Sequence, residues 1–203
     1  MGKRDKRLIE HQAALTAQSS QWWYHACGTA RHLAAGGHPP VQQVHGVVLQ
    51  PDEQLHLSTQ IGYSRYYARG DGSWARQTTL AVGPTSFVAG AMLGNAIANS
   101  RAANAARANA TMMWREQQRT GILITDRRVL CHSAGRGTWL SFWFNGVSEF
   151  YPDLSAWTTV CAFEQGDPLR LEGPENPLVA LWCARGILGD SWMSDPRLAP
   201  LLQ

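Results

Sequence analysis

The sequence has few charged residues. Asp, Glu, Lys and Arg together make up 16% of the 203 residues, whereas about a quarter is usual for a globular protein. Hydrophobic residues reach an ordinary 44%, and nine residues are tryptophan. A chain with few charges and many tryptophans has much apolar surface to cover, so we expect it to bind protein partners or to self-associate.

Catalytic signatures are also missing. The sequence contains no G-x-S-x-G, H-E-x-x-H, G-x-G-x-x-G or P-loop pattern, each of which holds reacting groups or phosphates at a fixed spacing. His25, Cys27, His32 and His38 form the only cluster with metal-ligand residue types, but on a helix Cys27 points away from the face that His25 and His32 share. We therefore predict a protein that is not an enzyme and uses no cofactor or metal. An enzyme using the His25/His32 region is a remote alternative.

The four cysteines form no C-x-x-C pair, and the chain begins with no secretory signal. Both features favour reduced thiols in the cytoplasm. The uncharged stretch 79–100 is long enough to span a membrane, but polar and helix-breaking residues lower its hydropathy: Pro84, Thr85, Ser86, Asn95 and Asn99. We predict a cytoplasmic protein, with a peripheral position at the inner membrane face left open.

The charges are distributed unevenly along the chain. Residues 60–140 carry ten arginines and three acids, a net charge of +7, whereas residues 141–203 carry three arginines and eight acids, a net charge of −5. Such asymmetry indicates either an anionic partner or a basic middle that packs beside the acidic end of the same fold. Nucleic acid is not expected, because the basic residues 3–7 are too few and too interrupted for a binding arm.

Hydrophobic periodicity predicts the elements. Apolar residues at helical spacing favour a helix over 8–35, and strict alternation over 54–61, continuing to Tyr67, favours a half-buried strand. The Ala- and Gly-rich stretch 85–118 reads as one long helix, in which Gly90 and Gly94 form a G-x-x-x-G motif that lets another backbone approach closely. Further strands are expected over 138–144, 147–151, 157–163 and 169–172, and a closing helix over 174–188.

The strand predicted over 138–144 is apolar on both faces, with Trp139 and Trp143 on one of them, so it must be covered twice. We expect the helical insertion to provide the outer cover. The stretch 120–131 is typical of a strand-turn-strand unit in which two short apolar runs flank Asp126, Arg127 and Arg128. A purely structural interpretation has Asp126 cap the turn while both arginines contact carbonyls or solvent.

The residues Ile122-Leu123-Ile124-Thr125-Asp126-Arg127-Arg128-Val129-Leu130 resemble the second-strand signature of bacterial pleckstrin-homology-like domains, including the related GRAM group. Residues 49–54 resemble the approach to the first strand of those domains, with Asp52 where they often carry Gly in Pro-Gly-Glu. The resemblance spans roughly residues 46–190. It implies an α+β fold: a PH-like antiparallel β-barrel with a C-terminal capping helix, here with a long Ala/Gly-rich helical insertion at about 75–118 and an N-terminal helix.

These observations predict an N-terminal helical segment (1–40), the barrel domain (46–190) and a C-terminal tail (191–203). The predicted function is a non-enzymatic interaction module that binds protein partners or self-associates through the helical insertion. The residues expected to pack this helix are Gly90, Gly94, Trp139 and Trp143. The alternative is a peripheral binder of anionic lipids through the Arg-rich segment 65–136. The candidate binding residues for partner or lipid are Arg65, Tyr67, Arg69, Arg76, Arg127 and Arg128.

Overall fold

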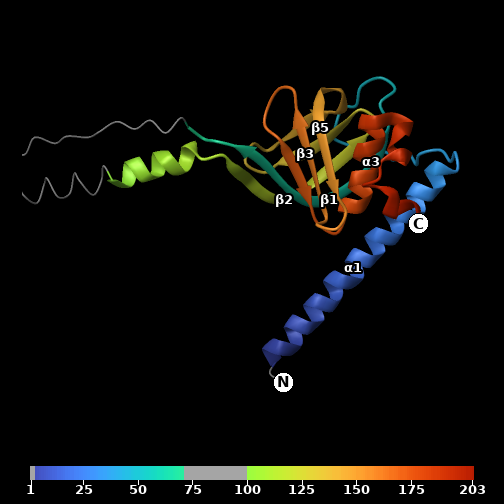
Figure 1. The fold of residues 1–203 in the computed structure, drawn as a ribbon, viewed down its shortest axis with the longest axis horizontal. Helices are drawn as coiled ribbons and strands as arrows, with labels where there is room; N and C mark the ends of the chain where they lie inside the picture. The colour runs from blue at the N-terminus through green and yellow to red at the C-terminus, as the bar shows by residue number, and fades with distance from the viewer. Residues whose placement is uncertain (1–2, 71–99) are drawn as a thin grey trace, which may run out of the picture. The chain divides into compact units, whose positions relative to one another are not determined.

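The computed structural model describes the backbone of residues 3–70 and 100–203, and the side chains within these ranges from residue 16 onward. The chain divides into two compact units. The first comprises Met1–Arg65 and Glu116–Gln203, and the second comprises Tyr66–Arg115. Figure 1 shows strands and helices in one mixed α+β fold, as the sequence predicts.

Seven antiparallel strands form one sheet in the order β4-β3-β2-β1-β7-β6-β5. The strands are β1 (Leu55–Tyr67), β2 (Met113–Thr125), β3 (Arg128–Ser133), β4 (Thr138–Trp143), β5 (Val147–Asp153), β6 (Thr158–Phe163) and β7 (Leu169–Glu172). All the strands expected from alternation are present within a few residues of their predicted bounds. The antiparallel sheet is confirmed, but it is not closed into the predicted barrel, because β4 and β5 lie at opposite ends of this order and do not pair in the described part of the chain. The single-turn 3-10 helix η1 (Phe144–Gly146) leads from one to the other.

The predicted strand-turn-strand unit is the β2–β3 hairpin, in which Ile124 faces Val129. The turn is shorter than predicted, because Arg128 already belongs to β3. The cap also differs from the prediction. The Thr125 hydroxyl accepts the backbone N–H groups of Arg127 and Arg128 at 3.1 and 3.0 Å, whereas Asp126 accepts the N–H of Gln54 at 2.9 Å. A threonine hydroxyl reaches backbone groups two and three residues ahead and so closes the turn.

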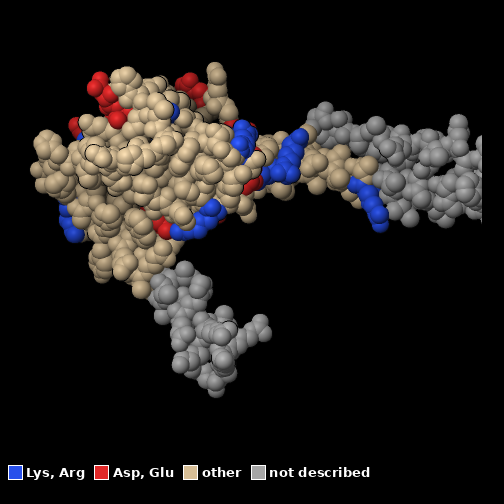
Figure 2. Space-filling view, turned by 180° about the vertical axis from the view of Figure 1, so that it is seen from behind, with Lys and Arg blue, Asp and Glu red and all other residues tan. Residues whose placement is uncertain are grey.

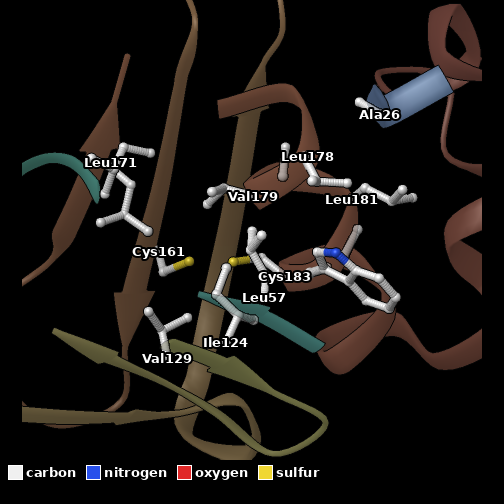
Figure 3. Packing of buried hydrophobic residues seen from close by; sticks show 14 of the residues in the cluster. Ala26, Leu57, Ile124, Val129, Cys161, Leu171, Leu178, Val179, Leu181 and Cys183 are labelled. Carbon is white, nitrogen blue, oxygen red and sulfur yellow. The ribbon is translucent and has the colours of Figure 1, made fainter. Parts of the chain in front are cut away.

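The α-helix α3 (Asn176–Leu188) follows β7 and matches the predicted closing helix. It begins beside Pro177, which suits the first helical turn, and Gly189 follows it with a φ of 56°. Nine consecutive residues of α3, from Asn176 to Ala184, are buried, so this helix fills the core rather than lying on it. Figure 3 shows Leu178, Val179 and Leu181 of α3 in the same apolar cluster as Leu57, Ile124 and Val129 of the sheet.

The N-terminal helix α1 (Lys3–Ala34) agrees with the predicted helix over 8–35. Its C-terminal part joins the same core through Ala26, Ala30 and Leu33, and small residues there let α1 approach α3 closely. Trp22 and Trp23 are half-buried against this core. All four cysteines of the chain carry free thiols and are buried, and Cys161 and Cys183 face each other in Figure 3.

The C-terminal tail is part of the core. It forms two 3-10 helices, η2 (Gly189–Ser194) and η3 (Ala199–Leu202). Trp192, Leu198 and Leu201 belong to the main hydrophobic cluster and are almost completely buried. A tail that supplies three core side chains belongs to the folded unit that the strands and α3 form.

A second, smaller apolar cluster covers the other face of the β2–β3–β4 part of the sheet. Leu55, Leu123 and Leu130 are its buried members, and Trp139 packs against them together with Val44, Val47 and Leu49. The two-sided cover predicted for β4 is thus present, since Phe142 and Phe144 lie in the main core. Among the described residues, segment 44–49 provides the outer cover. Cover by the insertion stays a prediction.

The second unit holds the end of β1, a helix over residues 100–110 and the start of β2. Arg115 holds it together: its guanidinium donates to the carbonyl oxygens of Tyr67 at 2.9 Å and Ala108 at 3.0 Å. The helix predicted over 85–118 ends at residue 110, because the β-strand β2 starts at Met113. Its earlier part, with Gly90 and Gly94, lies outside the described residues.

No helix in the described ranges is both long and apolar enough to cross a membrane. The uncharged stretch 79–100, whose membrane contact the sequence leaves open, falls outside those ranges except for its last residue.

Candidate functional site

A cleft of about 720 Å³ lies along the outer edge of β4, and we call it the β4 cleft. Its walls come from β4, from the turn after it and from the end of β6. The residues that matter for its chemistry are Arg65, Arg136, Leu140, Phe142, Trp143 and Phe163. The volume is typical of a ligand-binding pocket, and the mixture of aromatic walls with a few polar groups is typical as well.

The inner wall is apolar and carries a fixed cation. The rings of Phe142 and Phe163 lie 5.8 Å apart, and the Arg65 guanidinium lies over the Phe142 ring at 4.7 Å from its centroid. Two carbonyl oxygens of the β6–β7 turn hold this guanidinium: Nη2 donates to Asp167 at 2.6 Å and Nε to Pro168 at 3.3 Å. The Arg65 side chain is only 16% exposed. Stacking and carbonyl bonds therefore fix the position of the charge without neutralising it.

The Asp167 carboxylate is the nearest acidic group to Arg65, at 3.9 Å, and it is half exposed. A pair at this distance and exposure compensates the charge only weakly. Arg136, in the β3–β4 turn, is an exposed second cation of the cleft, and its side chain makes no hydrogen bond or ion pair with any described residue. Glu164 supplies the acid of the lining. Two cations and one acid thus line the cleft.

The backbone of β4 is unpaired along the cleft in the described part of the chain, because β4 ends the strand order. The N–H of Phe144 donates to the carbonyl of Arg127 at 2.9 Å, which fixes the direction of that residue towards β3. Peptide groups alternate in direction along an antiparallel strand. The N–H and C=O groups of Trp139, Ser141 and Trp143 therefore point away from β3, towards the open edge.

The outer wall is stiffened by a buried ion pair. Arg128 lies over the Trp143 ring at 4.5 Å from its centroid. Its Nε donates to Glu53 Oε1 at 2.8 Å and its Nη2 to Glu53 Oε2 at 2.9 Å, while Nη1 donates to Ser141 Oγ at 2.9 Å. The carboxylate of Glu53 also accepts the Thr125 hydroxyl at 2.8 Å. This network joins the approach to β1, the β2–β3 hairpin and β4 into one rigid support.

The pKa of Glu53 reflects that network. Burial raises it, but hydrogen bonds from Arg128, the Gln50 backbone N–H and Thr125, together with the positive charge of Arg128, outweigh burial and bring the pKa below its ordinary value of 4.5. Glu53 is therefore ionised at neutral pH, and the pair with Arg128 is a true ion pair.

The structure places the predicted binding residues in different locations. Arg65 lies in the β4 cleft, and Arg128 is buried beneath it. Arg127 is half-buried at the hairpin turn, with Asp126 at 3.8 Å. Tyr67 and Arg69 belong to the second unit, where the Tyr67 ring faces the Arg115 guanidinium at 5.9 Å. Arg76, like Gly90 and Gly94, lies outside the described residues.

Sequence reasoning missed Phe163, Glu53 and Arg136. Phe163 closes a predicted strand, but only the three-dimensional fold brings the end of β6 against β4. Glu53 belongs to the motif before β1. Its role as the partner of Arg128 depends on a contact between residues 75 positions apart, which the sequence does not show. Arg136 stood in the Arg-rich segment without any feature that set it apart.

The side chains of the predicted cluster, His25, Cys27, His32 and His38, have separate contacts. His25 stacks on Trp22 with ring centroids 5.9 Å apart, Cys27 is buried, and His32 Nε2 lies 3.1 Å from the carbonyl oxygen of His38. In the described part of the chain, no three His, Cys, Asp or Glu side chains are grouped so that they could hold a metal ion.

No protein-family model matches the chain, and no curated protein matches it in sequence.

Proposed function

We propose that the chain is a non-enzymatic interaction module of pleckstrin-homology-like fold that binds protein at the β4 cleft. The observation that carries the proposal is the cleft itself: about 720 Å³, aromatic walls, a fixed guanidinium and an unpaired strand edge, on a rigid support. Sites of this make-up bind ligands through apolar anchors and a few polar groups that set orientation.

The fold assignment is supported by how the two resembling motifs meet. Glu53 from the first motif and Arg128 from the second form the buried ion pair. Asp52 has a φ of 62°, a left-handed conformation that glycine adopts most readily, at the position where the resembling domains often carry Gly. The strand order and the C-terminal helix α3 after β7 agree with the same assignment.

Protein is a better partner than an anionic membrane for the described arginines, because several are already paired within the fold. Arg119 faces Glu175 at 2.5 Å, Arg128 faces Glu53 at 2.8 Å, and Arg197 faces Asp195 at 2.6 Å. On the face shown in Figure 2, basic and acidic atoms lie in small separate groups on a largely uncharged surface. An anionic membrane attracts a protein through several unpaired cations on one surface. Lipid binding therefore remains the alternative proposal. Binding of protein through the helical insertion remains a second alternative.

The test has two steps. A binding partner is first identified from native lysate and purified. Its affinity is then measured for the wild type and for matched variants of the cleft. Asn145 and Gln165 are exposed residues that line the cleft. We expect Asn145→Arg and Gln165→Arg to fill the cleft and weaken the partner's affinity about tenfold or more, measured by calorimetry. Ser148→Arg is the control, since Ser148 is exposed on β5 and does not line the cleft.

Equal binding by all three variants would place the partner elsewhere and refute the proposal. Sedimentation with anionic and neutral vesicles tests the lipid alternative in parallel. Binding to anionic vesicles that the cleft variants leave intact, without any protein partner, would favour that alternative.

A further inference from the structure

We infer that the β4 cleft takes an extended acidic segment of a partner protein, which pairs with β4 as an additional strand and sets an Asp or Glu side chain against Arg65. The inference rests on the proposed function of the cleft and adds the mode of binding and the chemistry of the partner. Four features of the cleft support it.

The first feature is the unprotected edge. Exposed sheet edges are commonly blocked by charged side chains, proline or bulges. At the other end of the sheet, β5 has all three: Glu149, Pro152 and a register shift between Val147 and Glu149. Strand β4, with the sequence TWLSFW, has no charge, no proline and a continuous register with β3. An edge without protection beside a cleft is suited to strand addition.

The second feature is the supply of backbone hydrogen bonds. Trp139, Ser141 and Trp143 each present one N–H and one C=O to the open edge, as derived above from the Phe144 bond to Arg127. An added strand in antiparallel or parallel register satisfies such groups through its own backbone, whereas a compact ligand reaches only one or two. Backbone pairing provides affinity that does not depend on the sequence of the partner.

The third feature is the apolar wall beside that edge. Side chains of an added strand alternate between the two faces of the sheet. On the face that Leu140 and Phe142 occupy, they meet these residues and Phe163. Every second residue of the partner segment should therefore be apolar.

The fourth feature is the fixed cation. Arg65 lies in the same wall, held by the Phe142 ring and two carbonyl oxygens, with most of its side chain out of solvent. A carboxylate that reaches it gains a charge-assisted interaction without ordering a flexible arginine first. Arg136 adds a second positive charge, and the single Glu164 leaves the lining net positive. An acidic side chain in the segment fits this charge, whereas a basic one is repelled.

The experiment screens a phage-displayed library of random linear peptides for binding to the full-length protein. The peptides are about twelve residues long, which is twice the length of β4. Enriched sequences are synthesised, and each is titrated in three forms: as selected, with its acidic residues changed to amides, and with an amidated C-terminus. Backbone amide NMR shifts locate each peptide on the chain. We expect enriched peptides that alternate apolar residues around an Asp or Glu and that shift the amides of β4.

Matched variants then test each part. Ser141→Pro removes an outward N–H from the edge and should weaken binding about tenfold or more, while Ser148→Pro, at the bulge of β5, should bind as the wild type. Arg65→Gln should weaken the acidic peptide about tenfold or more and leave the amide form unchanged. Arg136→Gln should weaken it severalfold, and because Arg136 is exposed this variant keeps the test valid where Arg65→Gln fails to fold.

The outcomes separate the inference from the proposed function. Peptides that bind at β4 without an acidic preference, or that resist Ser141→Pro, overturn the inference and leave the cleft a protein-binding site. Loss of affinity only on amidation of the C-terminus would reassign Arg65 to a terminal carboxylate and likewise overturn it. If none of the enriched peptides shifts the amide signals of β4, both the inference and the proposed function are contradicted.

Discussion

Arg128 and Glu53 lie 75 positions apart in the sequence and form one buried, two-pronged ion pair, with Nε–Oε1 at 2.8 Å and Nη2–Oε2 at 2.9 Å. The side chain of Glu53 is completely buried and that of Arg128 is 10% exposed. Around them, Thr125, Ser141 and the carbonyl of Val48 take up further hydrogen-bonding positions. The pair fastens the approach to β1 onto the β2–β3 hairpin, directly behind the β4 cleft.

Removal of one partner from this pair should be costly. Glu53→Gln leaves the Arg128 charge buried and uncompensated, so we expect the free energy of unfolding to fall by about 3–5 kcal/mol, measured by urea denaturation. Arg127→Gln is the control, because the Arg127 side chain is 40% exposed and lies 3.8 Å from its partner Asp126. This variant should change the free energy of unfolding by about 0.5 kcal/mol or less. Similar small losses in both variants would mean that the buried pair is not ionised.

The same pair should make the free energy of unfolding depend on pH in the acidic range. The folded pKa of Glu53 lies below its ordinary value of 4.5, so the unfolded chain takes up the proton first as the pH falls. The stabilisation is therefore fully present above pH 4.5 and is lost as the pH drops through the folded pKa. We expect the free energy of unfolding to decline below pH 4.5 in the wild type.

In Glu53→Gln this decline should be smaller, because the titrating group is gone. Asp195, whose pKa Arg197 lowers, remains in both proteins and accounts for part of the residual slope below pH 3.8. Parallel pH profiles for the two proteins would show that Glu53 does not contribute.

Two helical glycines should respond oppositely to alanine. A Cβ at Gly186 in α3 would lie 2.2 Å from ring carbons of Phe144, so helix and turn touch there without room for a methyl group. We expect Gly186→Ala to lower stability by about 1–3 kcal/mol through overpacking. At Gly28 in α1 a Cβ meets nothing within 4 Å, and Gly28→Ala should raise stability by about 0.5–1 kcal/mol through helix propensity alone. Thermal melting of the two variants beside the wild type measures both; stabilisation by Gly186→Ala would contradict the contact with Phe144.

The order of strands and helices could be predicted from the sequence because periodicity is a local property. Alternation around Leu57 and Ile61 predicts β1, and the two apolar runs around Asp126 predict the β2–β3 hairpin. Helix α3 follows from its capping proline and glycine. The end of the insertion helix was placed too far along, because the residues around Met113 carry no breaker between helix and strand.

Closure of the sheet and the candidate site depend on contacts between distant segments. A pattern of alternation states that β4 is apolar on both faces, but it does not state whether β5 pairs with it. Arg65 was a candidate for its residue type alone, and its fixed position results from Phe142 and the β6–β7 turn. Arg128 has the same residue type and is buried because of Glu53. Identical side chains thus acquire different roles from their neighbours, which a single sequence does not display.

The C-terminal tail provides the last prediction, because the sequence sets it apart from the domain and the structure packs it into the core. Truncation after residue 190 removes Trp192, Leu198 and Leu201, each at most 1% exposed. A single buried leucine cut to alanine costs about 2–5 kcal/mol, and whole domains are stable by only about 5–15 kcal/mol. We therefore expect the truncated chain to show no cooperative thermal transition and no near-ultraviolet circular dichroism of ordered tryptophan.

Point variants within the full chain keep this test interpretable. Leu201→Ala should lower the free energy of unfolding by about 2–5 kcal/mol, whereas Met193→Ala, at a residue 39% exposed in the same tail, should change it by about 0.5 kcal/mol or less. If the truncated chain melts cooperatively within a few degrees of the full-length protein, the tail is an appendage and its buried side chains contribute little. If it fails to fold while Leu201→Ala is destabilised and Met193→Ala is not, the hydrophobic core of this fold includes the side chains of residues 191–203.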